Sequence, residues 1–310
     1  MGNIQVLAIA GVGRSGSTIL ETALGQHQDF FPIGEFAMLW GEMNHDFLSN
    51  CGESFFKCTF WKTVFDQATD GFQGIDPDEI LKIRQAIDRN SLIPLIRTPA
   101  LRPKGYDSKL NRFLEVLSKI YSSIHEQSGG KIILDSSKSP AYFHILSLIP
   151  DIKLTIIHLV RDSRAVAYSW QKKKKMTYSL DREQYIERQG TAEASVKWLA
   201  KNMVAHTLTS IAANYTVIRY EDFANNPKDI VRTIVTEMGK DPNKLAYLTG
   251  EAADLSETHG ILGNPTPRAQ TQTIQIRQDT DWQDKLNWLD KWIVLFLTWP
   301  LLLRYGYFSS

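Results

Sequence analysis

Short apolar runs alternate with helix-like stretches along most of the chain. Four runs are short and continuous, as expected for strands buried on both faces of a sheet: residues 6–10, 131–134, 154–160 and 215–218. Apolar residues recur at helical spacing in six other stretches: residues 17–26, 75–90, 110–124, 141–148, 165–173 and 191–211. This alternation predicts an α/β fold in which helices flank a parallel sheet on both faces.

The stretch from residue 36 to residue 110 departs from this pattern. It holds many aromatic and turn-forming residues but no convincing strand. One helix within it has clear boundary signals, because Asp76 suits the N-cap, Pro77 the first helical position and Glu79 a capping box. We therefore predict a single domain, residues 1–310, in which residues 36–110 form a helical cap inserted over the sheet.

Length and charge narrow the class of protein. The chain has 310 residues, with 35 lysines and arginines against 34 aspartates and glutamates, a length that suits one large α/β domain. A formal net charge of +1 argues against a nucleic-acid-binding protein, so any anion site must be local. The N-terminus lacks the basic and apolar regions of a signal peptide, which predicts a cytoplasmic protein.

The longest apolar stretch, residues 292–303, is too short to cross a membrane. It has roughly 12 residues, including Thr298 and Pro300, whereas a membrane span needs about 20. We predict a buried C-terminal helix and no transmembrane span. A peripheral membrane contact or a homodimer contact through this helix is the alternative.

The chain has two cysteines, Cys51 and Cys58. Their spacing does not match a zinc ribbon, and no pair of histidines completes a metal site. A local disulfide is an alternative, but the absence of an export signal favours reduced thiols. The sequence therefore predicts a structural role for both cysteines and no bound metal.

A glycine-rich turn at residues 11–18, with the sequence GVGRSGST, joins the first predicted strand to its helix. Backbone N–H groups at such a turn, with a helix N-terminus behind them, form a cradle for an anion. Gly11, Gly16 and Thr18 fit the phosphate-loop pattern. Ser17 stands where that pattern has lysine, and the positive charge lies at Arg14 instead.

The place of this charge bears on the chemistry. A phosphotransferase uses the lysine and a magnesium ion to spread charge over two phosphates. A sulfuryl donor has a singly charged terminal group and needs no metal clamp, so the loop favours sulfuryl transfer. A kinase-like phosphotransferase that uses ATP is the alternative, supported by Leu134-Asp135, which resembles the end of a Walker B strand. A turn that binds no ligand is another.

A second candidate anion site follows the predicted strand at residues 154–160. Arg161 comes directly after this strand, at the carboxyl edge of the sheet, where α/β proteins bind ligands. Ser169 is eight residues further on, about two helical turns away. The guanidinium fork and the hydroxyl could bind one phosphate together. Two anion sites at separate strand ends suit a nucleotide that is phosphorylated at both ends of its ribose.

These two segments resemble the nucleotide-binding motifs of the sulfotransferase family. Residues 13–18 are similar to its 5′-phosphosulfate loop, and residues 159–169 are similar to its 3′-phosphate motif. The resemblance extends to residues 217–223 and 259–268 and is closest to the bacterial, carbohydrate and tyrosylprotein branches. It implies a P-loop-like sheet and the donor 3′-phosphoadenosine 5′-phosphosulfate (PAPS), which leaves as PAP, with no metal.

The resemblance also implies roles for matched residues. Four residues would hold the 5′-phosphosulfate: Arg14, Gly16, Ser17 and Thr18. Two residues would hold the 3′-phosphate: Arg161 and Ser169. Two more resemble the segment that covers the nucleotide: Asn264 and Arg268.

In-line displacement at sulfur requires a base for the acceptor proton and a cation for the bridging oxygen. By resemblance, Glu35 is the base, and Lys138 with Arg14 neutralises the bridging oxygen. Four histidines are rival bases: His27, His144, His158 and His206. Among them, His158 lies inside a predicted buried strand and is more typical of a core residue.

A run of lysines at residues 172–175 is interpreted as the solvated end of a helix, where cations suit the helix dipole. The alternative is that it steers anionic ligands toward a site. The expected function is transfer of a sulfuryl group from PAPS to a hydroxyl of a small-molecule acceptor, a metabolite or carbohydrate-like compound. An amine or carbamate nitrogen as acceptor, and a scaffold without turnover, are alternatives. We expect the aromatic residues of the cap to line the acceptor pocket: Phe36, Trp40, Phe47, Phe55, Phe56, Phe60 and Trp61.

Overall fold

A five-stranded parallel sheet forms the centre of the protein in a computed structural model that describes residues 4–176, 178–262 and 273–308. Its strands, in spatial order, are β2 (Phe30–Gly34), β3 (Ile132–Asp135), β1 (Ile4–Gly11), β4 (Ile152–Val160) and β7 (Asn214–Arg219). Every neighbouring pair in this sheet is parallel. The predicted α/β fold is confirmed, and the chain reverses its winding direction at β1, where such sheets bind ligands.

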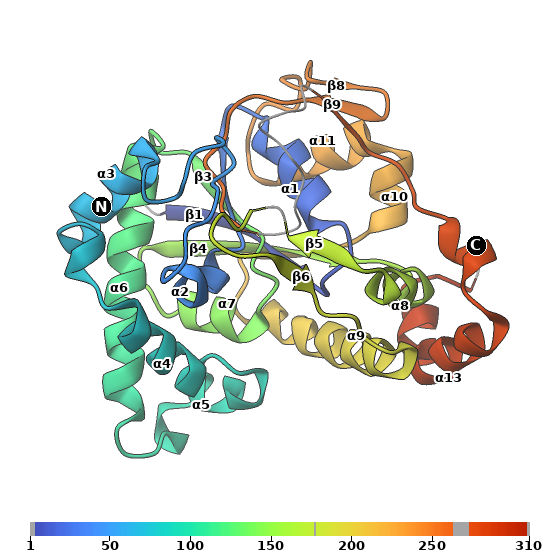
Figure 1. Cartoon of the computed structure of the whole chain (residues 1–310), viewed down its shortest axis with the longest axis horizontal. Coiled ribbons are helices and arrows are strands. Elements are labelled where there is room, and N and C mark those ends of the chain that lie inside the picture. Colours follow the sequence, from blue (N-terminus) through green and yellow to red (C-terminus); the bar gives the residue numbers. More distant parts are fainter. Residues whose placement is uncertain (1–3, 177, 263–272, 309–310) are drawn as a thin grey trace.

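Side chains of β1 alternate between two helical layers, which explains why the run reads as continuously apolar. Val6 and Ala8 belong to the core that includes helices α6 (Tyr106–Gln127) and α7 (Pro140–Leu146). Leu7 and Ile9 face the other way, into the core formed with α1 (Ser17–Gly25), α10 (Tyr220–Asn225) and α11 (Pro227–Glu237). Figure 1 shows these two groups of helices on opposite sides of the sheet.

Helices rather than strands fill most of the stretch between β2 and β3, as predicted. Those before α6 are α2 (Leu39–Glu42), α3 (Thr59–Thr69), α4 (Pro77–Ile87) and α5 (Ile93–Arg97). The Asp76 carboxylate caps α4 by accepting from the N–H groups of Asp78 (2.9 Å) and Glu79 (3.3 Å). Glu79 itself pairs with Arg112 at 3.4 Å instead of closing the capping box. The single-domain organisation stays a prediction.

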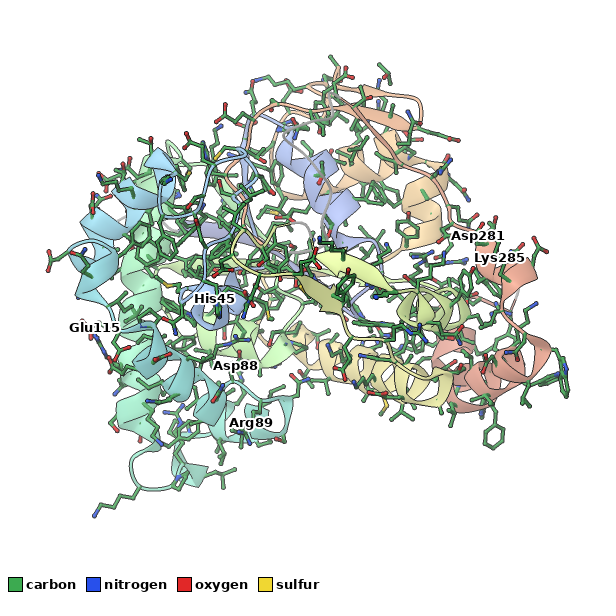
Figure 2. The ribbon with its side chains drawn as sticks, viewed as in Figure 1. His45, Asp88, Arg89, Glu115, Asp281 and Lys285 are labelled. Carbon is green, nitrogen blue, oxygen red and sulfur yellow. The ribbon has the colours of Figure 1, made fainter. Side chains whose placement is uncertain are left out.

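A buried carboxylate joins this helical stretch to the loop between β3 and α7. Asp88, which ends α4, accepts from Arg84 Nε at 2.9 Å and from the hydroxyl of Ser139 at 3.2 Å. Asp88 is labelled in Figure 2, in the same view as Figure 1, close to α7. The contact ties α4 to the residue that follows Lys138.

The remaining helices are α8 (Ser163–Gln171), α9 (Thr191–Ala205), α12 (Asp281–Lys285) and α13 (Trp288–Arg304). None of the helices in the described ranges combines the length and apolar character needed to cross a membrane. The prediction of a buried C-terminal helix is wrong for one face of α13. Val294 and Leu302 are buried, but Trp292 and Phe296 are 62% and 79% exposed, because only one side of the helix packs against α8 and α9.

Several strands were not predicted. The edge strand β2 contains Pro32, which cannot donate to a ladder and is tolerated at a sheet edge. The other strands are two or three residues long and form two small antiparallel sheets. One sheet pairs β5 (Lys174–Met176) with β6 (Gln184–Ile186). The other contains β8 (Leu248–Thr249), β9 (Ala252–Asp254) and β10 (Thr273–Gln275).

Candidate functional site

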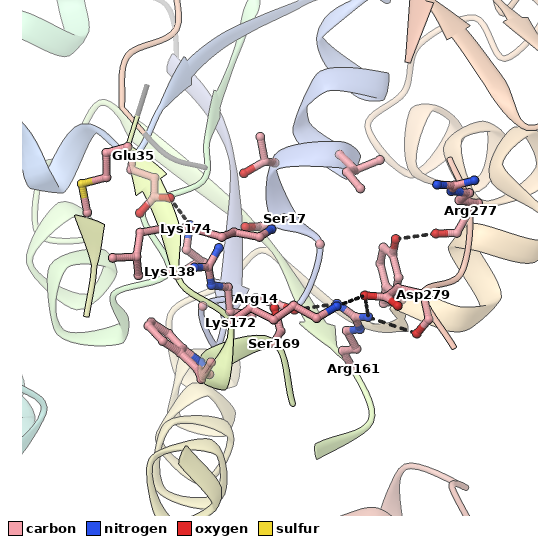
Figure 3. Close-up of a pocket in the computed structure, with 18 of the residues that line it drawn as sticks. Arg14, Ser17, Glu35, Lys138, Arg161, Ser169, Lys172, Lys174, Arg277 and Asp279 are labelled. Atoms are coloured by element: carbon pink, nitrogen blue, oxygen red, sulfur yellow. Dashed lines mark hydrogen bonds and ion pairs between the residues drawn. The ribbon is translucent and has the colours of Figure 1, made fainter. Parts of the chain in front are cut away.

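One cavity of about 830 Å³ lies at the carboxyl edge of the sheet (Figure 3). Its volume is within the range that suits a small organic ligand. Every predicted site residue that the structure describes lines it: Arg14, Gly16, Ser17, Thr18, Glu35, Lys138, Arg161 and Ser169. Asn264 and Arg268 lie outside the described residues. The fold therefore joins residues that are more than one hundred positions apart in the sequence.

Two glycines allow the loop after β1 to approach its neighbours closely. Gly11 has φ +134°, and a Cβ there would lie 2.4 Å from the carbonyl oxygen of Leu159. Gly16 has φ +88°, and a Cβ there would lie 2.2 Å from the ring of Tyr220. The loop leads into α1 at Ser17, where the first N–H groups of a helix have no partner within it and attract anions.

Arg14 sits at the tip of this loop in a left-handed backbone conformation, with φ 72°. Its guanidinium lies over the ring of Trp170, 5.2 Å from the centroid. Burial lowers the pKa of Arg14, and the nearby Glu35 carboxylate opposes this shift. Because the Arg14 guanidinium has already lost part of its hydration, its attraction to a bound anion is stronger than that of a fully hydrated guanidinium.

Lys138 and Glu35 form an ion pair at the cavity wall, with 2.7 Å between Nζ and Oε1 (Figure 3). Lys138 Nζ also donates to the carbonyl oxygen of Ser136 at 2.9 Å. The two side chains are 10% and 20% exposed, so both are largely withdrawn from water and still face the cavity. A carboxylate and an ammonium group side by side provide a proton acceptor and an electrostatic stabiliser.

One buried residue holds the Lys138–Glu35 pair in position. The sequence did not indicate that it would do so. The carboxylate of Glu21, on α1, accepts from the N–H of Gly34 at 2.7 Å and from the hydroxyl of Ser136 at 2.8 Å. It thereby fixes the segment just before Glu35 and the segment just before Lys138. A glutamate two per cent exposed inside a helix gives no sequence signal of this role, because its partners lie at the end of β2 and just after β3.

Arg161 reaches across from β4 to the glycine-rich loop. Its Nη1 donates to the carbonyl oxygen of Arg14 at 3.1 Å and its Nη2 to that of Asp279 at 3.4 Å. The guanidinium lies over Tyr220, 4.9 Å from the ring centroid. The indole N–H of Trp198 donates to the Arg161 carbonyl at 2.9 Å and holds its backbone. The two candidate anion sites therefore open into the same cavity.

Positive charge dominates the cavity. Its described lining includes six cationic side chains: Arg14, Lys138, Arg161, Lys172, Lys174 and Arg277. It includes three carboxylates: Glu35, Asp279 and Asp281. The imbalance favours an anionic ligand.

The lysine run is not simply the solvated end of a helix. Helix α8 ends at Gln171, and Lys174 begins strand β5. Lys172 Nζ lies 3.5 Å from the Asp279 carboxylate. Loss of hydration lowers the pKa of Lys174, and the charges of Arg14 and Lys172 lower it further. Lys172 and Lys174 both line the cavity, which supports the alternative role in attracting anions.

The aromatic residues of the stretch 36–110 do not line the cavity, contrary to expectation. Only Met38 from that stretch does so. The aromatic rings pack on one another instead, as in the stacked pair Phe47 and Phe55, whose centroids are 4.8 Å apart. Apolar side chains from other segments lie in the cavity wall with Met38: Met176, Tyr178, Ile186 and Leu262.

None of the four rival histidines is among the residues that line the cavity. His158 is buried in β4 between Asn202 Oδ1 at 2.8 Å and the Tyr215 hydroxyl at 2.7 Å. Burial lowers its pKa to about 4, so it is a neutral core residue at pH 7. This geometry leaves Glu35 as the best-placed candidate base among those predicted.

Asp135, the residue that resembled a Walker B aspartate, is also turned away from the cavity. It is fully buried and accepts from the Tyr121 hydroxyl at 2.5 Å and the Ser137 N–H at 2.8 Å. Burial raises its pKa to about 6. Its oxygens are engaged inside the core, which weighs against the kinase-like alternative.

Comparisons with known proteins agree with the sulfotransferase motifs. The sequence profile of the sulfotransferase family matches residues 7–241. The sulfotransferase domain from the curacin biosynthetic pathway is 16% identical, with a TM-score of 0.50 over 96% of this chain and 98% of that one. At that identity, the structural similarity supports the fold alone.

Two further solved structures are less similar. The sulfotransferase domain of the Synechococcus PCC 7002 olefin synthase is 19% identical, with a TM-score of 0.43 over 80% of this chain and 78% of that one. Sulfotransferase STF9 from Mycobacterium avium is 15% identical, with a TM-score of 0.42 over 79% and 67%. No curated protein sequence matches the chain. Since the family profile covers most of its length, the chain belongs to the sulfotransferase family and is a sulfotransferase enzyme.

Proposed function

We propose that this sulfotransferase moves the sulfuryl group of PAPS to a hydroxyl of a small-molecule acceptor and releases PAP. The observation that carries the proposal is the 3.1 Å hydrogen bond from Arg161 Nη1 to the Arg14 carbonyl. This hydrogen bond joins the two segments that we predict to bind anions, and both line one cavity. A single nucleotide with phosphates at both ends of its ribose can therefore reach both.

At the donor end, the Arg161 guanidinium and the Ser169 hydroxyl would bind the 3′-phosphate. The loop amides with Arg14, Ser17 and Thr18 would bind the 5′-phosphosulfate. Both groups are anionic, which fits the excess of cations around the cavity. Asn264 and Arg268 are proposed to cover the nucleotide, as the resemblance implies.

At the reacting end, Glu35 would accept the proton of the acceptor hydroxyl. The acceptor oxygen then forms its bond to sulfur, while the bond from sulfur to the 5′-phosphate oxygen breaks. Lys138 and Arg14 would stabilise the negative charge that develops on this bridging oxygen. The 2.7 Å ion pair between Lys138 and Glu35 supports this division of labour, because it keeps both groups at one point of the wall.

The acceptor is proposed to lie against the apolar wall beside Glu35. Met38, Met176, Tyr178 and Leu262 line the same cavity as Glu35. Thioethers, a phenol and an aliphatic group suit a small organic compound that carries a hydroxyl. An amine nitrogen in the same place would also give its proton to Glu35, so the nature of the acceptor atom is an outcome of the test.

The test combines acceptor screening with a matched variant. The chain is incubated with PAPS and a panel of alcohols, sugars and amines, and products are detected by a mass gain of one sulfuryl unit. We expect Glu35→Gln to lower turnover by about 10²–10⁴-fold and to bind PAP as the wild type does. Glu53→Gln, an exposed carboxylate outside the cavity, serves as the control.

Two outcomes would contradict the proposal. One is magnesium-dependent binding of ATP that displaces PAP in isothermal titration. The other is full turnover in the Glu35→Gln variant, which would remove Glu35 as the base.

A further inference from the structure

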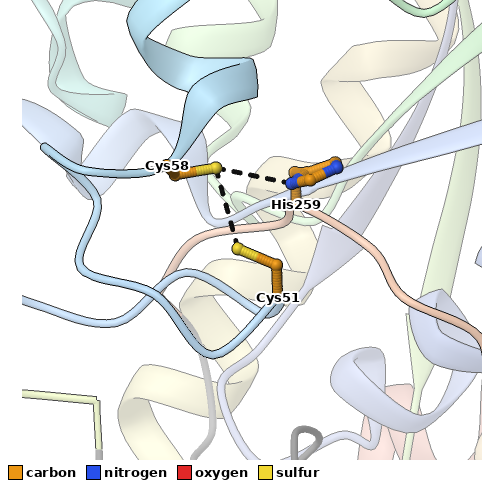
Figure 4. A group of neighbouring side chains, drawn as sticks. All are labelled: Cys51, Cys58 and His259. Carbon is orange, nitrogen blue, oxygen red and sulfur yellow. Dashed lines mark hydrogen bonds between the residues drawn. The ribbon is translucent and has the colours of Figure 1, made fainter.

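Three potential metal ligands meet outside the cavity (Figure 4). Cys51 Sγ lies 3.7 Å from Cys58 Sγ, and Cys58 Sγ lies 3.4 Å from His259 Nδ1. All three ligand atoms lie within 4.8 Å of one another. His259 is 201 residues from Cys58 in the sequence, so spacing along the chain gave no sign of this cluster.

Two of these separations match those of ligands around one tetrahedral ion, and the third is within 4.8 Å. With zinc–sulfur and zinc–nitrogen bonds of about 2.3 Å and 2.0–2.1 Å, tetrahedral geometry puts two sulfurs about 3.8 Å apart and a sulfur and a nitrogen about 3.6 Å apart. The measured values of 3.7 Å and 3.4 Å are close to both. A disulfide would instead require the two sulfurs at about 2.05 Å.

We propose that Cys51, Cys58 and His259 form a binding site for a zinc-like divalent ion, with two thiolates and one imidazole as ligands. Thiolate and imidazole are the ligands that zinc prefers in proteins. Cys58 is buried, whereas Cys51 and His259 are half-buried. Water can therefore complete the fourth position from the solvent side.

Neighbouring residues hold the ligands in place. The Trp61 indole N–H donates to the His259 carbonyl at 2.6 Å. The Phe60 ring stacks on the His259 imidazole at 5.1 Å with an interplanar angle of 12°. The Ser49 hydroxyl contacts Cys51 Sγ. Such outer contacts orient metal ligands before an ion binds.

An ion at this site would also fasten a segment that contacts Glu35, the proposed base. The N–H of Asn50 donates to the Gly260 carbonyl at 2.8 Å, next to His259. The N–H of Ile261 donates to the Ile33 carbonyl at 3.1 Å, and that of Glu35 donates to the Ile261 carbonyl at 3.0 Å. An ion bound by the cluster would clamp this segment against β2. Its stabilising effect does not depend on the proposed role of Glu35.

The test uses tag-free full-length chain, reduced and made metal-free by dialysis against a chelator. Titration with Co²⁺ is expected to saturate at about one ion per chain and to produce a thiolate-to-cobalt charge-transfer band. Zn²⁺ is expected to displace the cobalt and to raise Tm. Cys58→Ser and His259→Gln are each expected to weaken binding by more than about 100-fold, because even outer-contact changes cost 10–100-fold.

His125→Asn is the matched control, since His125 contacts the Lys131 carbonyl and is not one of the three ligands; it is expected to bind as the wild type does. The wild-type spectrum decides the question even where a ligand variant does not fold. The proposal is overturned if reduced wild-type chain gives no charge-transfer band, if His259→Gln binds cobalt as tightly as the wild type, or if the isolated chain contains a Cys51–Cys58 disulfide that reforms in preference to metal binding.

Discussion

The two ends of the cavity hold their cations in different surroundings. Arg161 donates to two backbone carbonyls and lies over the ring of Tyr220, with the Asp279 carboxylate 3.7 Å away. Lys138 is paired directly with the Glu35 carboxylate at 2.7 Å. A carboxylate at 3.7 Å neutralises the Arg161 guanidinium less than a carboxylate at 2.7 Å neutralises the Lys138 ammonium, so more of the Arg161 charge is available to a ligand. We infer that the first end binds the donor and the second end performs the reaction.

Among the variants that compare the two ends, the largest expected effect is on turnover at the Lys138 end. Lys138→Ala is expected to lower kcat by about 10²–10³-fold, the usual cost of losing one group that stabilises developing charge. PAP affinity should change little, because the lysine already has a carboxylate partner before a ligand binds. Steady-state kinetics and calorimetry measure the two quantities, with the exposed Lys153→Ala as control. A loss of PAP affinity as large as the loss of kcat would erase the contrast between the two ends.

A second prediction compares the strands that carry these ends. Burial lowers the pKa of His158, on β4, to about 4 and raises the pKa of Asp135, on β3, to about 6. Neutral His158 stabilises the fold above its unfolded pKa of about 6.5, and this contribution is lost as the pH falls toward 4. Protonated Asp135 acts in the opposite sense, with its contribution present below about pH 4 and lost as the pH rises through 6.

Between pH 7 and pH 5, His158→Gln should therefore lose less folding stability than the wild type, and Asp135→Asn should lose more. Each difference is expected to be about 1–2 kcal/mol. Chemical denaturation at the two pH values measures it. If both variants lose more stability than the wild type, or both lose less, the side chains of His158 and Asp135 do not have opposite effects on the pH dependence of stability.

The third prediction concerns the binding end. Arg161→Ala is expected to weaken PAP binding by about 10–100-fold, the range for one charge-assisted hydrogen-bonding group, with kcat nearly unchanged at saturating donor. Arg161→Lys should recover only part of the affinity, since it keeps the charge without the fork. Arg164→Ala is the control, because Arg164 pairs with Asp162 at 2.6 Å and does not line the cavity. Unchanged PAP affinity in Arg161→Ala would remove it from the donor site.

How far the sequence predicted the site also differs between the two ends. The glycine-rich loop and Arg161 lie within contiguous motifs next to apolar strands, so the sequence predicted both at the carboxyl edge of the sheet, and both line the cavity there. The reacting end depends on β2, which Pro32 concealed, and on Glu21, whose partners are far away in sequence. The apolar wall was misassigned, because aromatic content alone does not distinguish rings that line a cavity from rings that stack in a core. The segment 275–281, which contributes Arg277 and Asp279, carries no motif.

The smallest expected effect is on the KM for the donor when a lysine of the cavity is removed. It tests whether that lysine only attracts the donor over a distance or also contacts it. Lys174 lines the cavity, whereas Lys175, the next residue on β5, does not and pairs with Glu183. Successive side chains of a strand point to opposite faces, so the two lysines form a matched pair with one charge each. Lys174→Ala should raise KM for the donor by a few-fold at low salt, and the effect should disappear in high salt because the attraction is screened. Lys175→Ala should leave KM unchanged, and an effect of Lys174→Ala that persists in high salt would indicate a direct contact with the donor.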